Sequence, residues 1–401
     1  MIKNDLAVNI LNRSIFDEHI SREHTGSVKW DKMALTSLYG REDILPMWVA
    51  DMDFPSPEPI QKALIERANH PVFGYTVPSE SVYGEIQKWV KDRHQWSITK
   101  DMITFSSGVV SAIGSTIQAF TEPGDKILVQ SPVYTPFFDM IKNNGREVVN
   151  SPLLLEANGF AIDFEDFEEK LKTGVKLFLL CSPHNPGGRI WTKEELLRIG
   201  ELCLAHHVTI VSDEIHADLF HSTAMHHPIA SLADKLADIT VTLMAPSKTF
   251  NIAGLQASFL ITSNKELQVK LQNAQTRQAF HGLNIFALTA MEAAYRDGLS
   301  WLTDLIEYIE ENVKVAEAFI STEIPSLRVM HPDASYLLWI DCRELGLSDK
   351  EIQERLIHKG KIALEPGTKY GAGGEGFVRM NIGCSRSLLQ DGLTRLKLAF
   401  S

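Results

Sequence analysis

The sequence predicts an α/β protein in which a large domain with a mainly parallel sheet is joined to a smaller α+β domain. The first observation is the length of 401 residues, which exceeds the size at which a single hydrophobic core usually stops growing. The second is the alternation of short apolar runs with helical segments from about residue 100 onward. The third is a change past residue 283, where long amphipathic helices begin.

The first part of the chain is irregular and contains two tryptophans and several prolines. We expect residues 1–55 to form an arm that packs across the body and belongs to the small domain. A helix is predicted from about residue 57 to residue 69, with Ser56 as its N-cap. Residues 56–284 are then the large domain, and residues 285–401 the C-terminal part of the small domain.

Seven runs of β-type residues predict the strands of the large sheet. They lie at residues 103–105, 126–130, 147–150, 176–181, 208–212, 239–244 and 258–262. Several of these runs are apolar without alternation, as expected where both faces of a strand are covered. Thr192 and Glu195 have the spacing of a capping box, which predicts a helix from there to about residue 205.

The small domain is predicted from a second set of patterns. Residues 284–319 carry apolar side chains at helical spacing over a length that can hold two helices. We expect β-type runs at 327–330, 336–341 and 377–382, and helices near 348–359 and 385–400. A glycine-rich loop at 371–376 ends just before Arg379.

Composition argues against several classes of function. A formal net charge of −12 without a Lys/Arg cluster disfavours nucleic acid as a partner. No apolar run approaches the roughly 18 residues of a membrane span, and the start has no signal-peptide core, so we expect a cytoplasmic protein. No metal site is predicted from the histidines. Four widely spaced cysteines predict neither zinc ligands nor disulfides: Cys181, Cys203, Cys342 and Cys384.

Lys248 is the residue around which the functional prediction is built. It follows the β-type run 239–244 and lies among small and polar neighbours. A lysine at the end of a buried strand pairs with an anion, loses its proton, or forms an imine with an aldehyde. Taken alone, a solvated loop lysine is the ordinary alternative. The imine is favoured by what lies at the ends of the other predicted strands.

Two of those strand ends carry groups suited to a charged ligand. The Ser106-Ser107-Gly108 turn before a helix offers backbone N–H groups and hydroxyls to a phosphate, although such turns also use Ser and Gly for steric reasons. Asp213 closes another apolar run, where a carboxylate needs a cation such as a protonated pyridine nitrogen. Capping of the following segment is the alternative role for Asp213.

Three further residues fit a planar anionic ligand. Asn185, in a Pro- and Gly-rich turn, can donate to a ring hydroxyl or phenolate, and Tyr134 offers a face for stacking. Arg379, in an apolar run, suits a carboxylate, with an internal salt bridge as the structural alternative. Because strand carboxyl ends meet at one crevice in doubly wound sheets, these features together predict pyridoxal phosphate as the cofactor.

At this point the sequence resembles the fold-type I pyridoxal-phosphate enzymes of the class I/II aminotransferase superfamily. Within it, the segments 29–31, 45–54, 72–75 and 247–255 look like the MalY/PatB-type cystathionine β-lyase, or C–S lyase, branch. The resemblance runs from about residue 25 to the end. It implies the pyridoxal-phosphate-dependent transferase fold, which is also called aspartate aminotransferase-like.

The resemblance also implies roles for individual residues. Lys248 would carry the cofactor and move the substrate α-proton, Asp213 would pair with the pyridine nitrogen, and Asn185 would contact the ring oxygen. Tyr75 resembles a tyrosine that reaches the neighbouring subunit's cofactor phosphate, which implies a homodimer with shared active sites. The implied cofactor-binding residues are Lys248, Gly108, Val109, Val110, Tyr134, Asn185, Asp213, His216, Ser247 and Tyr75; the substrate-binding residues are Arg379, Ala50 and Tyr75; the catalytic residues are Lys248 and Tyr134.

Two positions depart from the aminotransferase pattern and favour the lyase branch. His216 stands where many aminotransferases have tyrosine, and Gln256 where they often have a phosphate-binding arginine. The predicted activity is α,β-elimination of L-cystathionine, or of similar cysteine S-conjugates, to pyruvate, ammonia and a thiol such as homocysteine. This activity belongs to sulfur amino-acid metabolism. The alternatives are an aminotransferase acting on an L-amino acid and a cofactor-binding regulatory protein.

Overall fold

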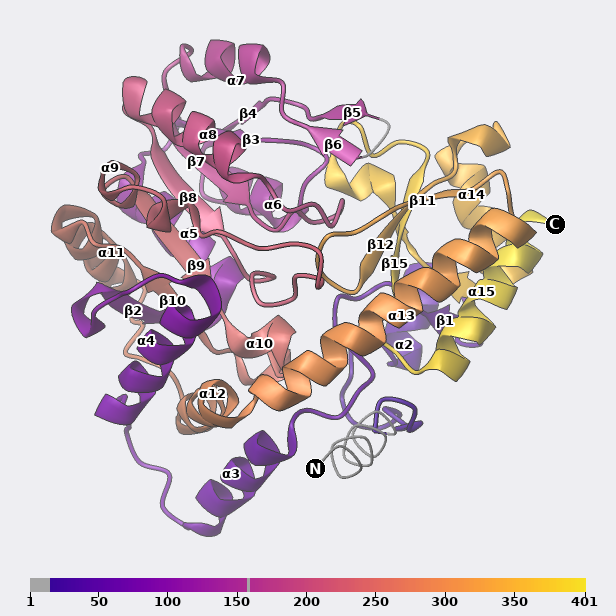
Figure 1. Cartoon of the computed structure of the whole chain (residues 1–401), viewed down its shortest axis with the longest axis horizontal. Coiled ribbons are helices and arrows are strands. Elements are labelled where there is room, and N and C mark those ends of the chain that lie inside the picture. Colours follow the sequence, from indigo (N-terminus) through magenta and orange to yellow (C-terminus); the bar gives the residue numbers. More distant parts are fainter. Residues whose placement is uncertain (1–14, 157–158) are drawn as a thin grey trace.

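The computed structural model describes residues 15–156 and 159–401 and is centred on a seven-stranded sheet (Figure 1). The strand order is β2-β10-β9-β8-β7-β3-β4, and β10 alone runs antiparallel to its neighbours in this sheet. The seven predicted runs correspond to its strands, so the predicted fold class is confirmed. The strands are β2 Ile103–Ser106, β3 Lys126–Val129, β4 Glu147–Asn150, β7 Val175–Cys181, β8 Thr209–Asp213, β9 Thr240–Met244 and β10 Ser258–Ile261.

Helices cover both faces of this sheet. Consecutive residues of a strand point to opposite faces, so alternate apolar side chains pack against different helices. Along β7, Leu177 and Leu179 pack in one apolar cluster with side chains of α5, α6 and α11, whereas Phe178 and Leu180 pack in another with α7 and α8. The predicted capping box of Thr192 opens α8. The helix bounds are α5 Val109–Phe120, α6 Pro136–Asn143, α7 Phe164–Leu171, α8 Lys193–Ala205, α9 Asp234–Ala237 and α11 Lys265–Arg277.

A second, four-stranded antiparallel sheet is formed by the C-terminal part of the chain in the order β11-β12-β15-β14. Its strands are β11 Arg328–Met330, β12 Leu337–Asp341, β14 Glu365–Pro366 and β15 Phe377–Asn381. The long helix α13 packs beside α15 next to this sheet (Figure 1). The helices here are α12 Ile285–Asp297, α13 Leu299–Glu323, α14 Asp349–Arg355, continued by a π turn Leu356–Gly360, and α15 Arg386–Phe400.

The N-terminal arm packs on the body, as predicted, but it is not wholly irregular. Helix α2, Lys32–Tyr39, is capped by the Asp31 side chain and ends at Gly40 with φ of 73°. Strand β1, Leu45–Pro46, pairs in parallel with β13, Ile362–Ala363. The arm is thus joined to the C-terminal part of the chain, while the domain boundaries at residues 55/56 and 284/285 stay a prediction.

The predicted cap at Ser56 is wrong. Helix α3, Glu58–Asn69, starts after Pro57 without a side-chain cap. The Ser56 hydroxyl instead donates to the Asn251 carbonyl at 3.1 Å, just beyond the turn that carries Lys248. A tertiary hydrogen bond has replaced the local one. Helix α4, Glu80–His94, follows α3 after an irregular connection.

None of the helices among the described residues combines the length and the apolar character needed to cross a membrane. The four cysteines are buried and unpaired.

Candidate functional site

A cavity of about 280 Å³ lies at the carboxyl ends of β7, β8 and β9, where the N-terminal arm and β15 meet the central sheet. This is the edge at which the sequence predicted a crevice. The residues that line it are Val49, Ala50, Val109, Val110, Tyr134, Cys181, Asn185, Asp213, Ile215, His216, Ser247, Lys248, Ala253 and Arg379. Nearly all the predicted site residues are therefore brought together in one place.

Lys248 extends into this cavity from α10, Pro246–Thr249, which begins directly after β9. Its Nζ donates to the Ala50 carbonyl at 2.5 Å. Burial lowers the pKa of Lys248 to about 8, against the opposing charge of nearby Asp51. An amine with such a pKa is partly neutral near physiological pH and can act as a nucleophile or a base.

Asp213 is the last residue of β8 and is 3% exposed. Its Oδ1 accepts a hydrogen bond from the Ile215 N–H at 3.1 Å. Burial, helped by the adjacent charge of Glu214 and opposed by the Ile215 N–H bond and the charge of Lys248, raises the pKa of Asp213 to about 7. A carboxylate with one backbone donor in a buried site is poorly compensated, so it favours a ligand that brings a proton or a positive charge.

Arg379 reaches the cavity from β15 and is 5% exposed. Its Nη1 donates to Asn185 Oδ1 at 3.1 Å and its Nη2 to the Trp48 carbonyl at 2.8 Å, while the guanidinium carbon lies 5.2 Å from the Tyr370 ring centroid. Among the described residues Nε has no partner and no carboxylate forms an ion pair with this arginine. The salt-bridge alternative is thus not found, and the charge is available to an anionic ligand.

The N-terminus of α5 forms the end of the cavity suited to a phosphate. Gly108, the N-cap, has φ of 117°, which favours glycine, and no side chain caps the helix. The Gly108 N–H donates to Ser258 Oγ at 3.1 Å and the residue does not line the cavity, so its predicted phosphate contact stays a prediction. Val109, Val110 and Ser247 do line it. A helix N-terminus with open N–H groups attracts anions.

Tyr134 and His216 supply neutral rings to the cavity. Burial raises the pKa of Tyr134 to about 12, so its phenol keeps its proton. Burial and the charge of Lys248 lower the pKa of His216 to about 3, so its imidazole is neutral. Within the described residues the buried His216 Nδ1 has no hydrogen-bond partner.

Two residues of the prediction lie away from this cavity. Tyr75 is fully exposed in the connection between α3 and α4, so it does not reach the site of its own chain. Gln256 is also exposed and does not line the cavity, so its side chain does not contribute to the phosphate end of the cavity.

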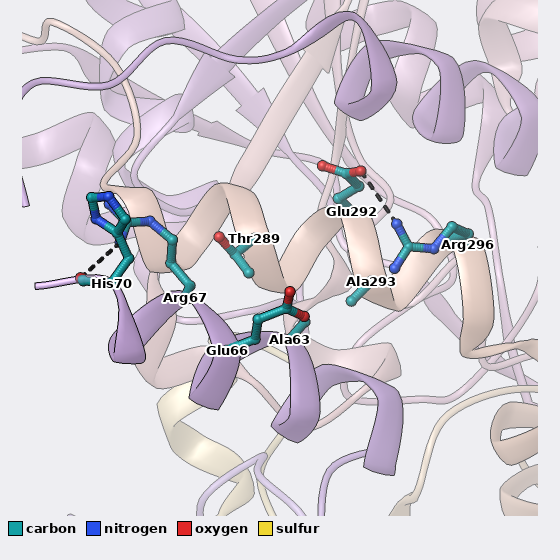
Figure 2. A pocket seen from close by; sticks show the side chains of 8 residues that line it. All are labelled: Ala63, Glu66, Arg67, His70, Thr289, Glu292, Ala293 and Arg296. Atoms are coloured by element: carbon teal, nitrogen blue, oxygen red, sulfur yellow. Dashed lines mark hydrogen bonds and ion pairs between the residues drawn. The ribbon is translucent and has the colours of Figure 1, made fainter. Parts of the chain in front are cut away.

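A larger cavity of about 540 Å³ lies between α3 and α12, as Figure 2 shows. Glu292 and Arg296 form an ion pair at 3.3 Å in its wall. The residues that line it are Ala63, Glu66, Arg67, His70, Thr289, Glu292, Ala293 and Arg296. None of the predicted site residues lines it, so size alone does not identify the reactive site.

Sequence reasoning did not find how the 48–54 segment is held against Lys248. Asn381 Nδ2 donates to the carbonyls of Val49 and Asp51, at 2.5 and 2.6 Å. The Tyr336 hydroxyl donates to the Ala50 carbonyl at 3.0 Å. These bonds fix the Ala50 carbonyl, which accepts from Lys248.

An ion network in the arm anchors the same segment. Lys29, only 1% exposed, pairs with Asp53 at 2.7 Å, and Arg22 pairs with Asp51 at 2.8 Å. Trp30 Nε1 donates to Asp53 Oδ1 at 2.8 Å. The segments 29–31 and 45–54 carry the family resemblance described above. The signal in the sequence for these ion pairs was the presence of Asp51 and Asp53 downstream of the basic residues Arg22 and Lys29.

Comparison with known proteins gives consistent matches over almost the whole chain. The chain is 55% identical to cystathionine β-lyase PatB of Bacillus subtilis over 387 residues, covering 96% of this chain and 100% of that protein. The structure of cystalysin from Treponema denticola, which contains a pyridoxal 5′-phosphate cofactor, matches with a TM-score of 0.91 and 37% identity, covering 96% and 98% of the two chains. A pyridoxal-phosphate-bound C–S lyase from Staphylococcus hominis matches with a TM-score of 0.89 and 32% identity, covering 96% and 97%.

The family described as aminotransferase class I and II matches residues 42–396. This range contains every predicted site residue, from Ala50 to Arg379. The matched range, the shared fold and the identity with PatB agree with the resemblance found in the motifs. The chain therefore belongs to the aminotransferase class I and II family, in its MalY/PatB branch.

Proposed function

We propose that this chain is a pyridoxal-phosphate-dependent C–S β-lyase that cleaves L-cystathionine, or similar cysteine S-conjugates, with water to pyruvate, ammonia and a thiol such as homocysteine. The observation that carries the proposal is that Lys248, Asp213 and Arg379 line the same cavity. The identity with a cystathionine β-lyase over 96% of the chain supports the lyase reaction.

The residues of the cavity fit the cofactor. The buried Asp213 carboxylate suits a protonated pyridine nitrogen, which would supply the charge that the site lacks. The open N-terminus of α5 suits the phosphate, and the amine of Lys248 suits the aldehyde. When bound, the cofactor supplies an electron sink for the carbanion that forms when the substrate loses its α-proton.

Each chain residue then has a defined task. Arg379 binds the substrate α-carboxylate and thereby orients the Cα–H bond. Lys248 removes the α-proton, which its lowered pKa permits near neutral pH. Asp213 would hold a protonated ring nitrogen, and Tyr134 would pack against the ring. After loss of the α-proton, the substrate would break its Cβ–S bond and release the thiolate. In amino transfer the Cβ–S bond would stay intact, and the amino group would leave the substrate instead.

Substituting Arg379→Lys tests the carboxylate assignment. Lysine keeps the charge but loses the planar fork, so we expect KM for L-cystathionine to rise by about 10- to 100-fold, with a smaller effect on kcat. Steady-state kinetics measure the change, and Arg343→Lys, at an exposed arginine bonded to Asp341, is the matched control. An unchanged KM would remove Arg379 from the substrate site.

The reaction itself is tested with a panel of amino acids and the purified holoenzyme. We expect pyruvate and a free thiol from L-cystathionine and from cysteine S-conjugates, and no keto acid from L-alanine, which lacks a β leaving group. Efficient transfer of amino groups to 2-oxo acids without release of a thiol would replace the lyase by an aminotransferase.

We also propose that the chain acts as a homodimer with shared active sites. Large apolar side chains are exposed around α3 and the connection to α4, next to the cavity of Figure 2. They are Ile65, Val72, Phe73, Tyr75 and Val77. An exposed apolar group of this kind marks an interaction surface.

We propose a cytoplasmic location because the cysteines are unpaired, which suits a reducing compartment.

Mixing two variants, each of which we expect to be inactive alone, tests the shared site. In a Tyr75→Ala and Lys248→Ala mixture, each mixed dimer contains one site with both native residues. At equal amounts, random re-association makes about half of the dimers mixed, so we expect about a quarter of the wild-type sites to recover. Activity is measured after partial denaturation and re-association of the mixture, with each variant treated alone as control. A Tyr75→Ala variant that is active alone, or a mixture that recovers no activity, would place Tyr75 outside the neighbouring site.

A further inference from the structure

Asp218 is a buried carboxylate that the proposed mechanism does not use. It is 6% exposed and lies in the turn that follows Asp213 and contains His216. Its Oδ1 accepts from Trp89 Nε1 and pairs with His94 Nε2, both at 2.9 Å. Both partners belong to α4, a helix outside the cavity (Figure 1).

The second oxygen of this carboxylate faces the lysine turn. Thr249 Oγ1 donates to Asp218 Oδ2 at 2.9 Å, and Thr249 is fully buried. The backbone carbonyl of Asp218 also accepts from Arg93 of α4, at 2.6 Å. Asp218 is therefore a single point at which α4, the turn after β8 and α10 are joined.

The charge of this group is well compensated. Burial alone would raise the pKa of Asp218, but the hydrogen bond and charge of His94, with help from Arg93 and Trp89, hold it below the ordinary value. A buried carboxylate with several donors is a rigid centre, since moving any donor leaves a charge unsatisfied.

Helix α10 has few other side-chain anchors. It is four residues long, and the side-chain hydrogen bonds of its described residues are those of Lys248 to Ala50 and of Thr249 to Asp218. The first must break when Lys248 reacts. The second, from the residue directly after Lys248, can persist.

We propose that Asp218, through Thr249 and anchored by Trp89 and His94 of α4, is a positioning group that holds Lys248 at a fixed place relative to Asp213. This inference rests on the proposed function, because it takes Lys248 as the reacting lysine. The two carboxylates lie five positions apart, Asp213 at the end of β8 and Asp218 in the turn that follows. Asp213 faces the cavity, and Asp218 bonds the element that carries the amine.

The expected effect is on the chemical step. A displacement of about 1 Å in a reacting group can lower the rate by about 100-fold, whereas substrate binding through Arg379 does not depend on α10. Loss of the Thr249 hydroxyl should therefore lower kcat and leave KM nearly unchanged. It should also alter the surroundings of the Lys248 amine.

The test compares Thr249→Val, which has the same shape without the hydroxyl, with Thr249→Ser, which keeps it. We expect the holoenzyme of T249V to lose at least about tenfold in kcat, with KM for L-cystathionine within about twofold, and T249S to regain most of the activity. The pH midpoint of the visible absorption band of the bound cofactor should shift in T249V but not in T249S. This second readout does not depend on turnover.

Thr240→Val is the matched control. Thr240 is fully buried at the other end of β9, and its Oγ1 donates to the Leu236 carbonyl at 2.7 Å. We expect T240V to lose thermal stability like T249V but to keep kcat and the absorption midpoint. Equal kcat and equal midpoints in T249V and T240V would overturn the proposal.

A second variant keeps the proposal testable if T249V does not fold. Trp89→Phe removes one donor to Asp218 and keeps an aromatic ring, and we expect a smaller fall in kcat with unchanged KM. When T249V is unfolded, wild-type kcat in W89F would contradict the positioning role. Failure of this inference can be told apart from failure of the proposed function. If Lys248 is not the reacting lysine, the Lys248→Ala enzyme will keep a normal absorption band.

Discussion

The Lys248→Ala enzyme is expected to be inactive and to lack the visible absorption band that the lysine-linked cofactor gives. The alanine removes both the nucleophile for the aldehyde and the base for the α-proton. Positioned bases alone contribute about 10²- to 10⁴-fold, so the fall in kcat should be at least of this size. Absorbance spectra and the pyruvate assay measure the two effects on one preparation.

The control for this substitution is Lys270→Ala, at an exposed lysine that pairs with Glu266 on the surface of α11. It should leave both the band and the rate unchanged. A visible band that survives in Lys248→Ala would mean that another amine carries the cofactor. The lowered pKa of Lys248, about 8, would then be a consequence of its burial and not a sign of a catalytic role.

The Asp213→Asn enzyme is expected to show opposite changes in activity and in the stability of the cofactor-free protein. Asparagine can still accept the Ile215 N–H bond but cannot hold a proton on the pyridine nitrogen, so kcat should fall by about 100-fold or more. In the cofactor-free protein the same change removes a buried charge. Thermal unfolding should therefore occur at a higher temperature than in the cofactor-free wild type at pH 8.

The pH dependence of that gain follows from the pKa of Asp213, which burial raises from 3.8 to about 7. Between these values the folded protein binds more protons than the unfolded chain, so this group makes the free energy of unfolding fall as pH rises. Above pH 7 the full cost is present, on the order of 4 kcal/mol, and near pH 4 it is largely absent.

Unfolding of the cofactor-free proteins at pH 4 and pH 8 measures this difference. Asp238→Asn, at an exposed carboxylate, is the control and should show no gain at either pH. A cofactor-free D213N protein that is no more stable than the wild type at pH 8 would mean that Asp213 is compensated by a partner in the folded chain.

The parts of the fold that depend on local patterns could be predicted from the sequence. Apolar runs bounded by turn residues identified all seven strands of the central sheet, because buried parallel strands have a distinctive composition. The pairing of β1 with β13 could not be found, since it joins segments more than 300 residues apart and each is only two residues long. Ser56 shows the same limit: a favourable local cap was replaced by a bond to Asn251.

The candidate site divides in a similar way. Residues directly at strand ends, such as Lys248 and Asp213, are placed by the geometry of the sheet, so their order in the chain was enough to bring them together. The groups that hold them in position come from elsewhere. Asn381 and Lys29 bind the 48–54 segment, and Asp218 binds α10, through tertiary contacts that no local pattern records.

The central claim is that the carbanion formed at this site leads to loss of a thiolate. The most direct measurement is the product ratio in one reaction that contains the holoenzyme, L-cystathionine and 2-oxoglutarate. The account predicts pyruvate and homocysteine in equal amounts, with little glutamate. Glutamate as the main product, without homocysteine, would contradict it.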